Sequence, residues 1–212
     1  MDSRIASNNA DRASIGFDAD RNVYWQRLTQ GLESLLAEKT FPQITVADIV
    51  RRAHTSRRTF YEHFESKEAC LLALHRQASR EEAAHALAAV DGTAVWQMQL
   101  RQAIEAWIAF ADTRSELAMS WIRDLPLLGA AASDLQREVT DQFVRTIQTV
   151  CGSEGFRAAG GRDVSRARAL VLIGGLERLA ADAAQRGQKM AIYTDDAVQA
   201  AIALATGSRG ES

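Results

Sequence analysis

A chain of 212 residues that is 47% hydrophobic and has only two prolines is long enough for a sizeable, mainly helical core of one or two domains. Its formal net charge of −2 excludes a generic polyanion binder, so any attraction to nucleic acid has to be local. Cys70 and Cys151 lack the spacing of a disulfide framework or a zinc site, and no apolar run approaches the ~18 residues of a membrane span. The N-terminus also lacks the apolar region of a signal peptide. We therefore expect a cytoplasmic protein without metal or cofactor.

The first predicted element is a helix over about residues 22–38. Residues 1–20 before it are polar and charged and are expected to form a mobile arm. The helix has an inward stripe of leucines at helical spacing, namely Leu28, Leu32, Leu35 and Leu36. Phe41-Pro42 is expected to end it.

Two short helices in a tight turn are predicted next. Thr45 and Asp48 form a capping pattern, in which the threonine oxygen accepts from a free amide and the carboxylate lies at the positive helix end. The first short helix therefore begins near Val46. The small Ala53 permits close approach of a second helix, for which Ser56 is the expected N-cap. This arrangement is a helix-turn-helix.

The second short helix has the side chains that a major-groove helix needs. Phe60 and Phe64 lie one turn apart and are expected to pack inward, which leaves Arg58, Thr59 and Glu62 facing outward. An arginine can donate two hydrogen bonds to guanine. The four arginines of this region alone would fit an ordinary solvated surface. Together with the capping, turn and aromatic pattern, they predict DNA binding.

At these residues the chain resembles the TetR family of bacterial transcriptional regulators, whose DNA-binding segment runs I-T-V-x-x-I-A-x-x-A-G-V-S-x-x-T-x-Y-x-H-F-x-x-K. The matching residues are Ile44, Thr45, Val46, Ile49, Ala53, Ser56, Thr59, Tyr61, His63, Phe64 and Lys67. The resemblance implies phosphate contacts by Thr45, Thr59, Tyr61, His63 and Lys67. It implies approach to base edges by Arg57, Arg58 and Thr55.

Three residues depart from the usual pattern or fit it poorly. His54 stands where the family has glycine, in a turn that often requires positive φ, at some cost in strain. Thr55 replaces an apolar turn residue. Glu62 would repel phosphate unless it pairs with Arg58 one turn earlier or accepts from cytosine, and the pair is the expectation for the free protein.

The rest of the chain is expected to be helical, which makes the fold all-α. Ser66 is expected to open a long helix, which in the family carries motion to the DNA-binding head. Beyond about Glu81 the composition is Ala-rich, and joints at 91–92, 124–129, 152–161 and 187–194 separate four helical blocks. We expect a DNA-binding domain over 21–66 and a regulatory domain over 67–212.

The resemblance implies a small-molecule pocket in the second domain. Large apolar side chains in the relevant blocks suit an apolar or aromatic effector, and the candidates are Trp96, Trp107, Phe110, Met119, Trp121 and Phe143. Plain core packing is the alternative for each of them.

A dimer interface is expected near the C-terminus. The block Ala167–Ala184 is apolar on nearly every side, so it needs cover on two faces. By its position in the family, this block and the last helix (about 195–205) would form a four-helix interface. The candidate residues are Leu172, Gly175, Leu176, Val198 and Ile202. A helix buried within one monomer is the alternative.

The sequence thus predicts a homodimeric, non-enzymatic regulator, acting as a repressor that an effector releases from a palindromic operator. An architectural or interaction protein with the same head and no effector is the alternative. An enzyme is disfavoured, because the chain has no phosphate loop and no nucleophile elbow.

Overall fold

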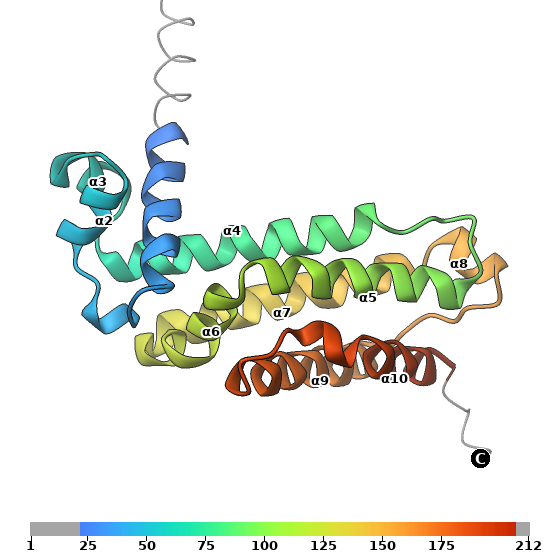
Figure 1. The fold of residues 1–212 in the computed structure, drawn as a ribbon. Coiled ribbons are helices and arrows are strands. Elements are labelled where there is room, and N and C mark those ends of the chain that lie inside the picture. The colour runs from blue at the N-terminus through green and yellow to red at the C-terminus, as the bar shows by residue number, and fades with distance from the viewer. Residues whose placement is uncertain (1–21, 207–212) are drawn as a thin grey trace, which may run out of the picture. The chain divides into compact units, whose positions relative to one another are not determined.

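The computed structural model describes residues 22–206, and its regular elements in that range are all helices, which confirms the all-α prediction (Figure 1). In chain order they are a helix of residues 22–36, η1 (Phe41–Gln43), α2 (Val46–Arg52), α3 (Arg57–His63), α4 (Lys67–Ala88), α5 (Trp96–Thr113), α6 (Ser115–Arg123), η2 (Leu125–Leu128), α7 (Ala130–Cys151), α8 (Glu154–Ala158), α9 (Arg166–Gln185), η3 (Met190–Tyr193) and α10 (Thr194–Thr206). The arm expected over residues 1–20 lies outside the described residues.

The chain divides into two compact units between Leu74 and His75, a point inside α4. The first unit, which we call the head, contains the predicted short helices α2 and α3. The second unit, which we call the body, contains the remaining helices and the longer part of α4. One continuous helix therefore belongs to both units. No helix in the described range is long and apolar enough to cross a membrane.

The core of the head forms around the predicted leucine stripe. Leu28 and Leu32 are fully buried, and Leu35 and Leu36 nearly so. Gly31, on the same helix, lies against the turn after α2, where an added Cβ would stand 3.2 Å from the Ala53 nitrogen. A glycine on one helix and an alanine on the other thus let the two backbones approach closely.

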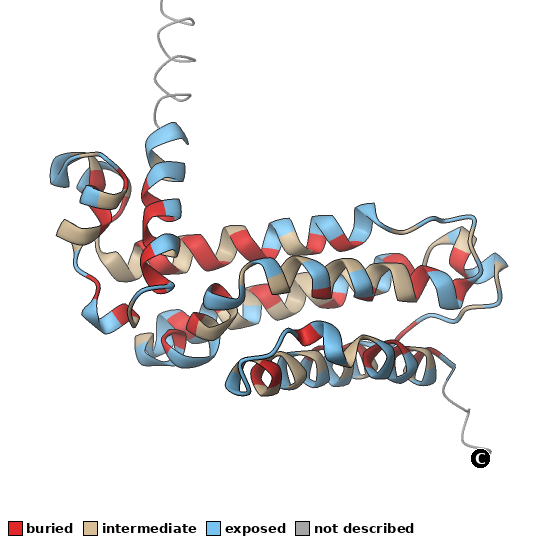
Figure 2. Ribbon diagram, in the orientation of Figure 1, coloured by how far each residue is buried: buried red, intermediate tan, exposed pale blue. Residues whose placement is uncertain are grey.

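In the body, α9 packs against α7 and α10, and α10 packs against α5. The buried side chains of these helices and of α8 form one core, which includes Ile108, Phe156 and Val198. In Figure 2 exposed residues recur along one side of α9 and α10, so the described residues do not cover these two helices all round.

The structure of the body differs from the four predicted helical blocks at two places. One block is split at Arg114, whose backbone (φ −128°, ψ 40°) ends α5 and begins α6. No glycine or proline marks the break. The Arg114 guanidinium pairs with Glu81 at 2.9 Å and lies over the Phe110 ring at 5.8 Å, so tertiary contacts hold the bend. The joint 152–161 contains the short helix α8, capped by Ser153.

Candidate DNA-binding head and ligand cavity

The predicted cap of α2 is present. The Thr45 hydroxyl donates to Asp48 Oδ2 (2.8 Å) and accepts from the Asp48 amide (3.2 Å), while the Thr45 amide donates to Asp48 Oδ2 (3.0 Å). Lys39 donates to the same carboxylate at 2.9 Å. The Lys39 hydrogen bond and those from Thr45 hold the pKa of Asp48 well below its usual range. The start of α2 is therefore held by a charged network on the surface of the head.

The turn between α2 and α3 has the strained backbone that the sequence predicts. His54 has φ +50°, in the left-handed region. The Thr55 amide donates to the Val50 carbonyl (2.9 Å) and the His54 amide to that of Arg51 (3.3 Å), which together form a Schellman motif. The Arg27 guanidinium donates to the His54 carbonyl at 3.3 Å. Local hydrogen bonds thus hold a histidine in a conformation that favours glycine.

The recognition helix α3 begins at the predicted N-cap. The Ser56 hydroxyl accepts from the Thr59 amide at 3.0 Å and lies 2.9 Å from the Thr59 hydroxyl. Phe60 is fully buried and contacts Phe64, with ring centroids 5.7 Å apart. His63 Nδ1 lies 2.8 Å from the Thr59 carbonyl oxygen. Packing of Phe60 fixes the rotation of α3 and leaves its arginine side outward.

Acidic partners accompany three of the four arginines in this region. Arg51 pairs with Asp48, Arg52 with Glu38 at 2.7 Å, and Arg58 with Glu62 at 3.0 Å. The Arg58–Glu62 pair expected for the free protein is thus present. Arg57 is exposed and is the one of the four for which the described residues supply no ion pair. The positive potential around α2 and α3 is therefore weaker than a count of the four arginines suggests.

Two other predicted contact residues differ in their surroundings. Tyr61 is 60% exposed, with its ring packed edge-on against Phe60 at 5.4 Å. The Lys67 ammonium donates to the carbonyls of Phe41 (3.1 Å), Pro42 (3.4 Å) and Ile44 (2.8 Å), and so caps η1. A phosphate contact by Lys67 stays a prediction, because its three donors already have acceptors within the head.

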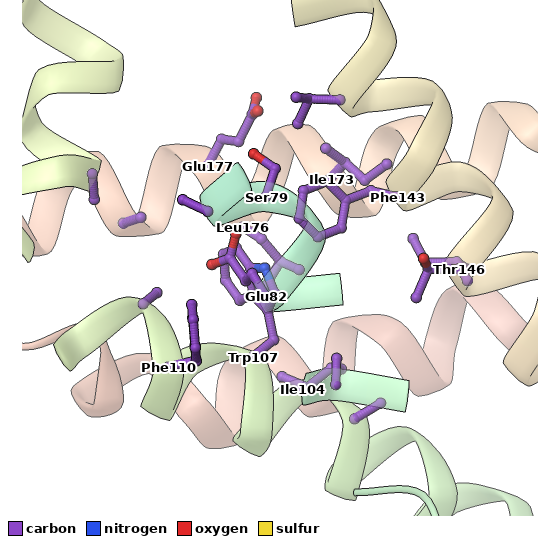
Figure 3. Close-up of a pocket in the computed structure, with 18 of the residues that line it drawn as sticks. Ser79, Glu82, Ile104, Trp107, Phe110, Phe143, Thr146, Ile173, Leu176 and Glu177 are labelled. Carbon is purple, nitrogen blue, oxygen red and sulfur yellow. The ribbon is translucent and has the colours of Figure 1, made fainter. Parts of the chain in front are cut away.

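The body contains a cavity of ≈ 200 Å³ formed by α4, α5, α6, α7 and α9 (Figure 3). Of the six predicted effector residues, four line it, namely Trp107, Phe110, Trp121 and Phe143. Trp96 does not, because it packs edge-on against the buried Phe156 at 5.7 Å in the core. Met119 is not among the lining residues either. The wall is otherwise mostly aliphatic.

Sequence reasoning missed the charged groups of this cavity. Glu82, Glu177, His75 and Arg114 all line it. On α4, His75, Ser79, Glu82 and Ala86 are spaced four, three and four residues apart, which places Glu82 on the stripe that faces the cavity. This spacing is the feature of the sequence from which the position of Glu82 in the cavity could have been predicted. An isolated glutamate in a helix otherwise indicates a solvated face.

The predicted interface residues are mostly inside the chain. Leu172 and Leu176 line the cavity, and Val198 is fully buried in the core of the body. Ile202 is partly buried against that core. Only Gly175 faces outward, with open space beyond the position of a Cβ. The physical reason is that a helix apolar all round gives no contrast by which its sequence could reveal the outer face.

A different set of residues forms the outward face of the last long helices. The exposed apolar and glycine residues are Ala167, Leu170, Val171, Gly174 and Gly175 on α9 and Ala200 and Ala203 on α10; Arg166, Glu177 and Arg178 of α9 and Gln199 of α10 are exposed as well. Val171 is 62% exposed and Leu170 39%. Beyond the backbone of α9 itself, no atom of the described residues lies within 4 Å of a Cβ built on Gly174 or Gly175. We call this set the α9–α10 face. It is small-residue-rich and apolar, which suits close packing of another helix pair.

The head has the helix-turn-helix geometry of a DNA-binding unit. Residues 28–74 match the model of the family described as "Bacterial regulatory proteins, tetR family". The fold is similar to FadR of Bacillus subtilis, solved with stearoyl-CoA (TM-score 0.72, 14% identity, covering 87% of this chain and 100% of that one). It is also similar to FadR of Bacillus halodurans (TM-score 0.72, 14% identity, 89% and 97%) and to GusR of Salmonella enterica (TM-score 0.68, 16% identity, 86% and 95%). No curated protein matches the sequence. The head thus matches the DNA-binding segment of the tetR family, and the fold of the chain is that of solved transcriptional regulators.

Proposed function

We propose that this regulator is a homodimeric repressor that leaves a palindromic operator when a small molecule binds in the body. The observation that carries the proposal is the cavity of ≈ 200 Å³, because its wall includes the same helix, α4, that continues into the head. A ligand that alters α4 in the body acts on an element shared with the DNA-binding unit.

For the head, we propose that α3 lies in the major groove. Base edges are read by Arg57 and Arg58, with Thr55 beside them, and phosphates are contacted by Thr45, Thr59, Tyr61, His63 and Lys67. The exposure of Arg57 and Tyr61 and the fixed rotation of α3 support these roles. Phosphate contacts position the protein and base contacts give specificity. The head is thus proposed to separate the two tasks between the start of α3 and its flanks.

Dimerisation is proposed to occur through the α9–α10 face, which replaces the residues expected from the sequence. An isologous pair of such faces would form a four-helix contact in which Gly174 and Gly175 allow close backbone approach. Two heads could then occupy successive major grooves about 34–36 Å apart. This geometry is why the proposed operator is palindromic.

The effector mechanism is linkage. If the effector binds better to a conformation whose two heads no longer fit successive grooves, DNA binding must weaken effector binding by the same factor. The alternative function is an architectural protein that uses the head without an effector. The cavity favours the regulator, since a chain without a ligand would not require five helices to leave such a space.

The proposed repressor mechanism is tested by operator selection and release. Sites selected from random duplexes by the purified protein should be palindromic, and a small-molecule library should contain compounds that dissociate the complex. Palindromic sites whose binding no compound changes would favour the architectural alternative.

The proposed interface is tested by a charge on the α9–α10 face. We expect Val171→Glu to give folded monomers with weak operator binding, because an unpaired carboxylate would lose hydration in each of two facing subunits. Leu127→Glu is the matched control, since Leu127 is 66% exposed on η2. Sedimentation and circular dichroism are the measurements. A Val171→Glu protein that remains dimeric would place the interface elsewhere.

A further inference from the structure

The cavity contains an acid that an apolar ligand would not require. Glu82 extends from α4 into the middle of the cavity, beside the ring of Trp107 (Figure 3). The Trp107 side chain interacts with the Glu82 carboxyl and lowers its pKa. A polar group and an aromatic ring of the same residue thus lie next to the acid.

The two basic residues that line the cavity near Glu82 are either already paired with an acid or neutral. Arg114 lines the cavity but pairs with Glu81 at 2.9 Å. Burial lowers the pKa of His75 to about 4, so this histidine is neutral at physiological pH. Glu177, on α9, adds a second carboxyl to the wall; the residue is exposed overall, and partial burial of its carboxyl raises its pKa. The cavity wall thus has two carboxyl groups, and its one charged base already pairs with Glu81.

The electrostatic consequence is an acid that holds its proton in the empty cavity. Burial raises the pKa of Glu82 to about 8, Glu177 adds to the rise, and Arg114 and the Trp107 hydrogen bond oppose it. A positively charged ligand would reverse this balance, because it adds a counter-charge to that of Arg114, which Glu81 shares.

We propose that the effector is a compact organic cation, such as a primary amine with an aromatic or aliphatic body, whose nitrogen binds the Glu82 carboxylate. The body of the ligand lies against Trp107, Phe110 and Phe143, whose ring faces also attract positive charge. This assignment rests on the proposed function, in which the cavity is an effector site.

Other ligand classes fit the wall less well. An anion would meet two carboxyl groups, and the one arginine at the wall already has an acidic partner. A neutral apolar molecule would displace water from the Glu82 carboxyl without supplying a polar group of its own, at a cost in affinity. The volume of ≈ 200 Å³ lies below the roughly 300–1,000 Å³ of drug-sized sites, which favours a compact ligand.

The test compares three ligands that differ in charge and share one body: phenylbutylamine, phenylbutanol and phenylbutyrate. Binding to the full-length protein without DNA is measured by titration calorimetry and by tryptophan fluorescence. We expect the amine to bind roughly 10-fold to 100-fold more tightly than the alcohol, and phenylbutyrate to bind most weakly. Competition by the amine against the alcohol would show that they share the cavity.

Two variants assign the selectivity to Glu82. Glu82→Gln keeps an acceptor for Trp107 but removes the charge, so we expect it to abolish the preference for the amine and leave alcohol binding unchanged. Glu105→Gln removes an exposed carboxylate on α5 that pairs with Arg101, and it should change neither. Calorimetry in buffers of different ionisation enthalpy should also show proton release when the amine binds near pH 7, and Glu82→Gln should abolish it.

The outcomes separate this inference from the proposed function. Equal binding of alcohol and amine, unchanged selectivity in Glu82→Gln, or no binding of any of the three ligands would overturn the assignment of a cation. Effector release of the operator by uncharged compounds alone would overturn it too, and would leave the repressor mechanism in place. Selective binding of the amine that never alters operator affinity would support the cation site and refute its role as an effector site.

Discussion

Replacing Glu82 with glutamine should change how the stability of the protein depends on pH. The folded-state pKa of this carboxyl is about 8, against an ordinary value of 4.5. The folded protein therefore binds this proton more tightly than the unfolded chain does. The resulting stability is fully present below about pH 4.5 and is lost as pH rises toward about 8. Glu82→Gln has no such proton, so this loss should be absent.

The magnitude follows from the width of the interval. One pKa unit corresponds to about 1.36 kcal/mol, so the full shift corresponds to about 5 kcal/mol as an upper bound. His75 acts in the opposite direction, because its pKa falls from 6.5 to about 4 and its contribution therefore rises with pH across that range. Between pH 6.5 and about 8, only the stability contribution of Glu82 still changes with pH, because that of His75 is constant there. It is worth about 2 kcal/mol, or about 1 kcal/mol once partial screening by water in the cavity is allowed for.

The assay is urea denaturation followed by circular dichroism at fixed protein concentration, from about pH 6.5 to about pH 8.5. Measurements stop there because burial raises the pKa of Cys70 and Cys151 to about 12, and their thiols ionise in the unfolded chain from about pH 9. Wild type should lose stability over this range relative to Glu82→Gln, while Glu105→Gln should follow wild type. Parallel curves for wild type and Glu82→Gln would show that Glu82 is ionised in the folded protein at neutral pH.

Arg57→Ala should cost about 1–3 kcal/mol in specific operator binding and relax base preference at one position per half-site, measured by competition with scrambled duplexes. Arg58→Ala should cost less, because Arg58 has to leave Glu62 before it contacts a base; an equal loss on random DNA would make both arginines phosphate contacts. Lys67→Met should destabilise the protein by about 1–3 kcal/mol in thermal denaturation, through loss of its three carbonyl acceptors; unchanged stability, with a salt dependence of DNA binding lower by about one ion, would assign this lysine to phosphate instead. His54→Gly should raise stability by about 0.5–1 kcal/mol, since glycine adopts φ +50° without strain; a destabilised variant would mean that the histidine side chain contributes more than its backbone costs.

Much of the head could be predicted from the sequence because its signals are local. The caps at Thr45 and Ser56, the buried Phe60 and the positive φ at His54 each depend on residues within a few positions. The Arg58–Glu62 pair follows from one helical turn. What the sequence could not indicate was the environment of Lys67, since its acceptors lie 23 to 26 residues away.

Prediction was weaker in the body because its determinants are non-local. The bend at Arg114 depends on a salt bridge to Glu81, which lies 33 residues earlier. The inward direction of Leu176 depends on how α9 rotates against α7, and an all-apolar surface does not encode that rotation. Trp96 was assigned to the cavity by residue type alone, whereas Phe156 holds it in the core. Residue type identified the cavity aromatics but not which of them the helices bring together.

The ion pair on the recognition helix has a consequence for the search along the chromosome. While Arg58 remains paired with Glu62, the guanidinium charge is internally neutralised, and the protein is held less tightly to arbitrary sequence. If Arg58 reads a base as proposed, a guanine at that position offers two acceptors in exchange for one carboxylate, which makes breaking the pair favourable there. Glu62 would thus speed dissociation from non-specific DNA while lowering the affinity for the operator only slightly.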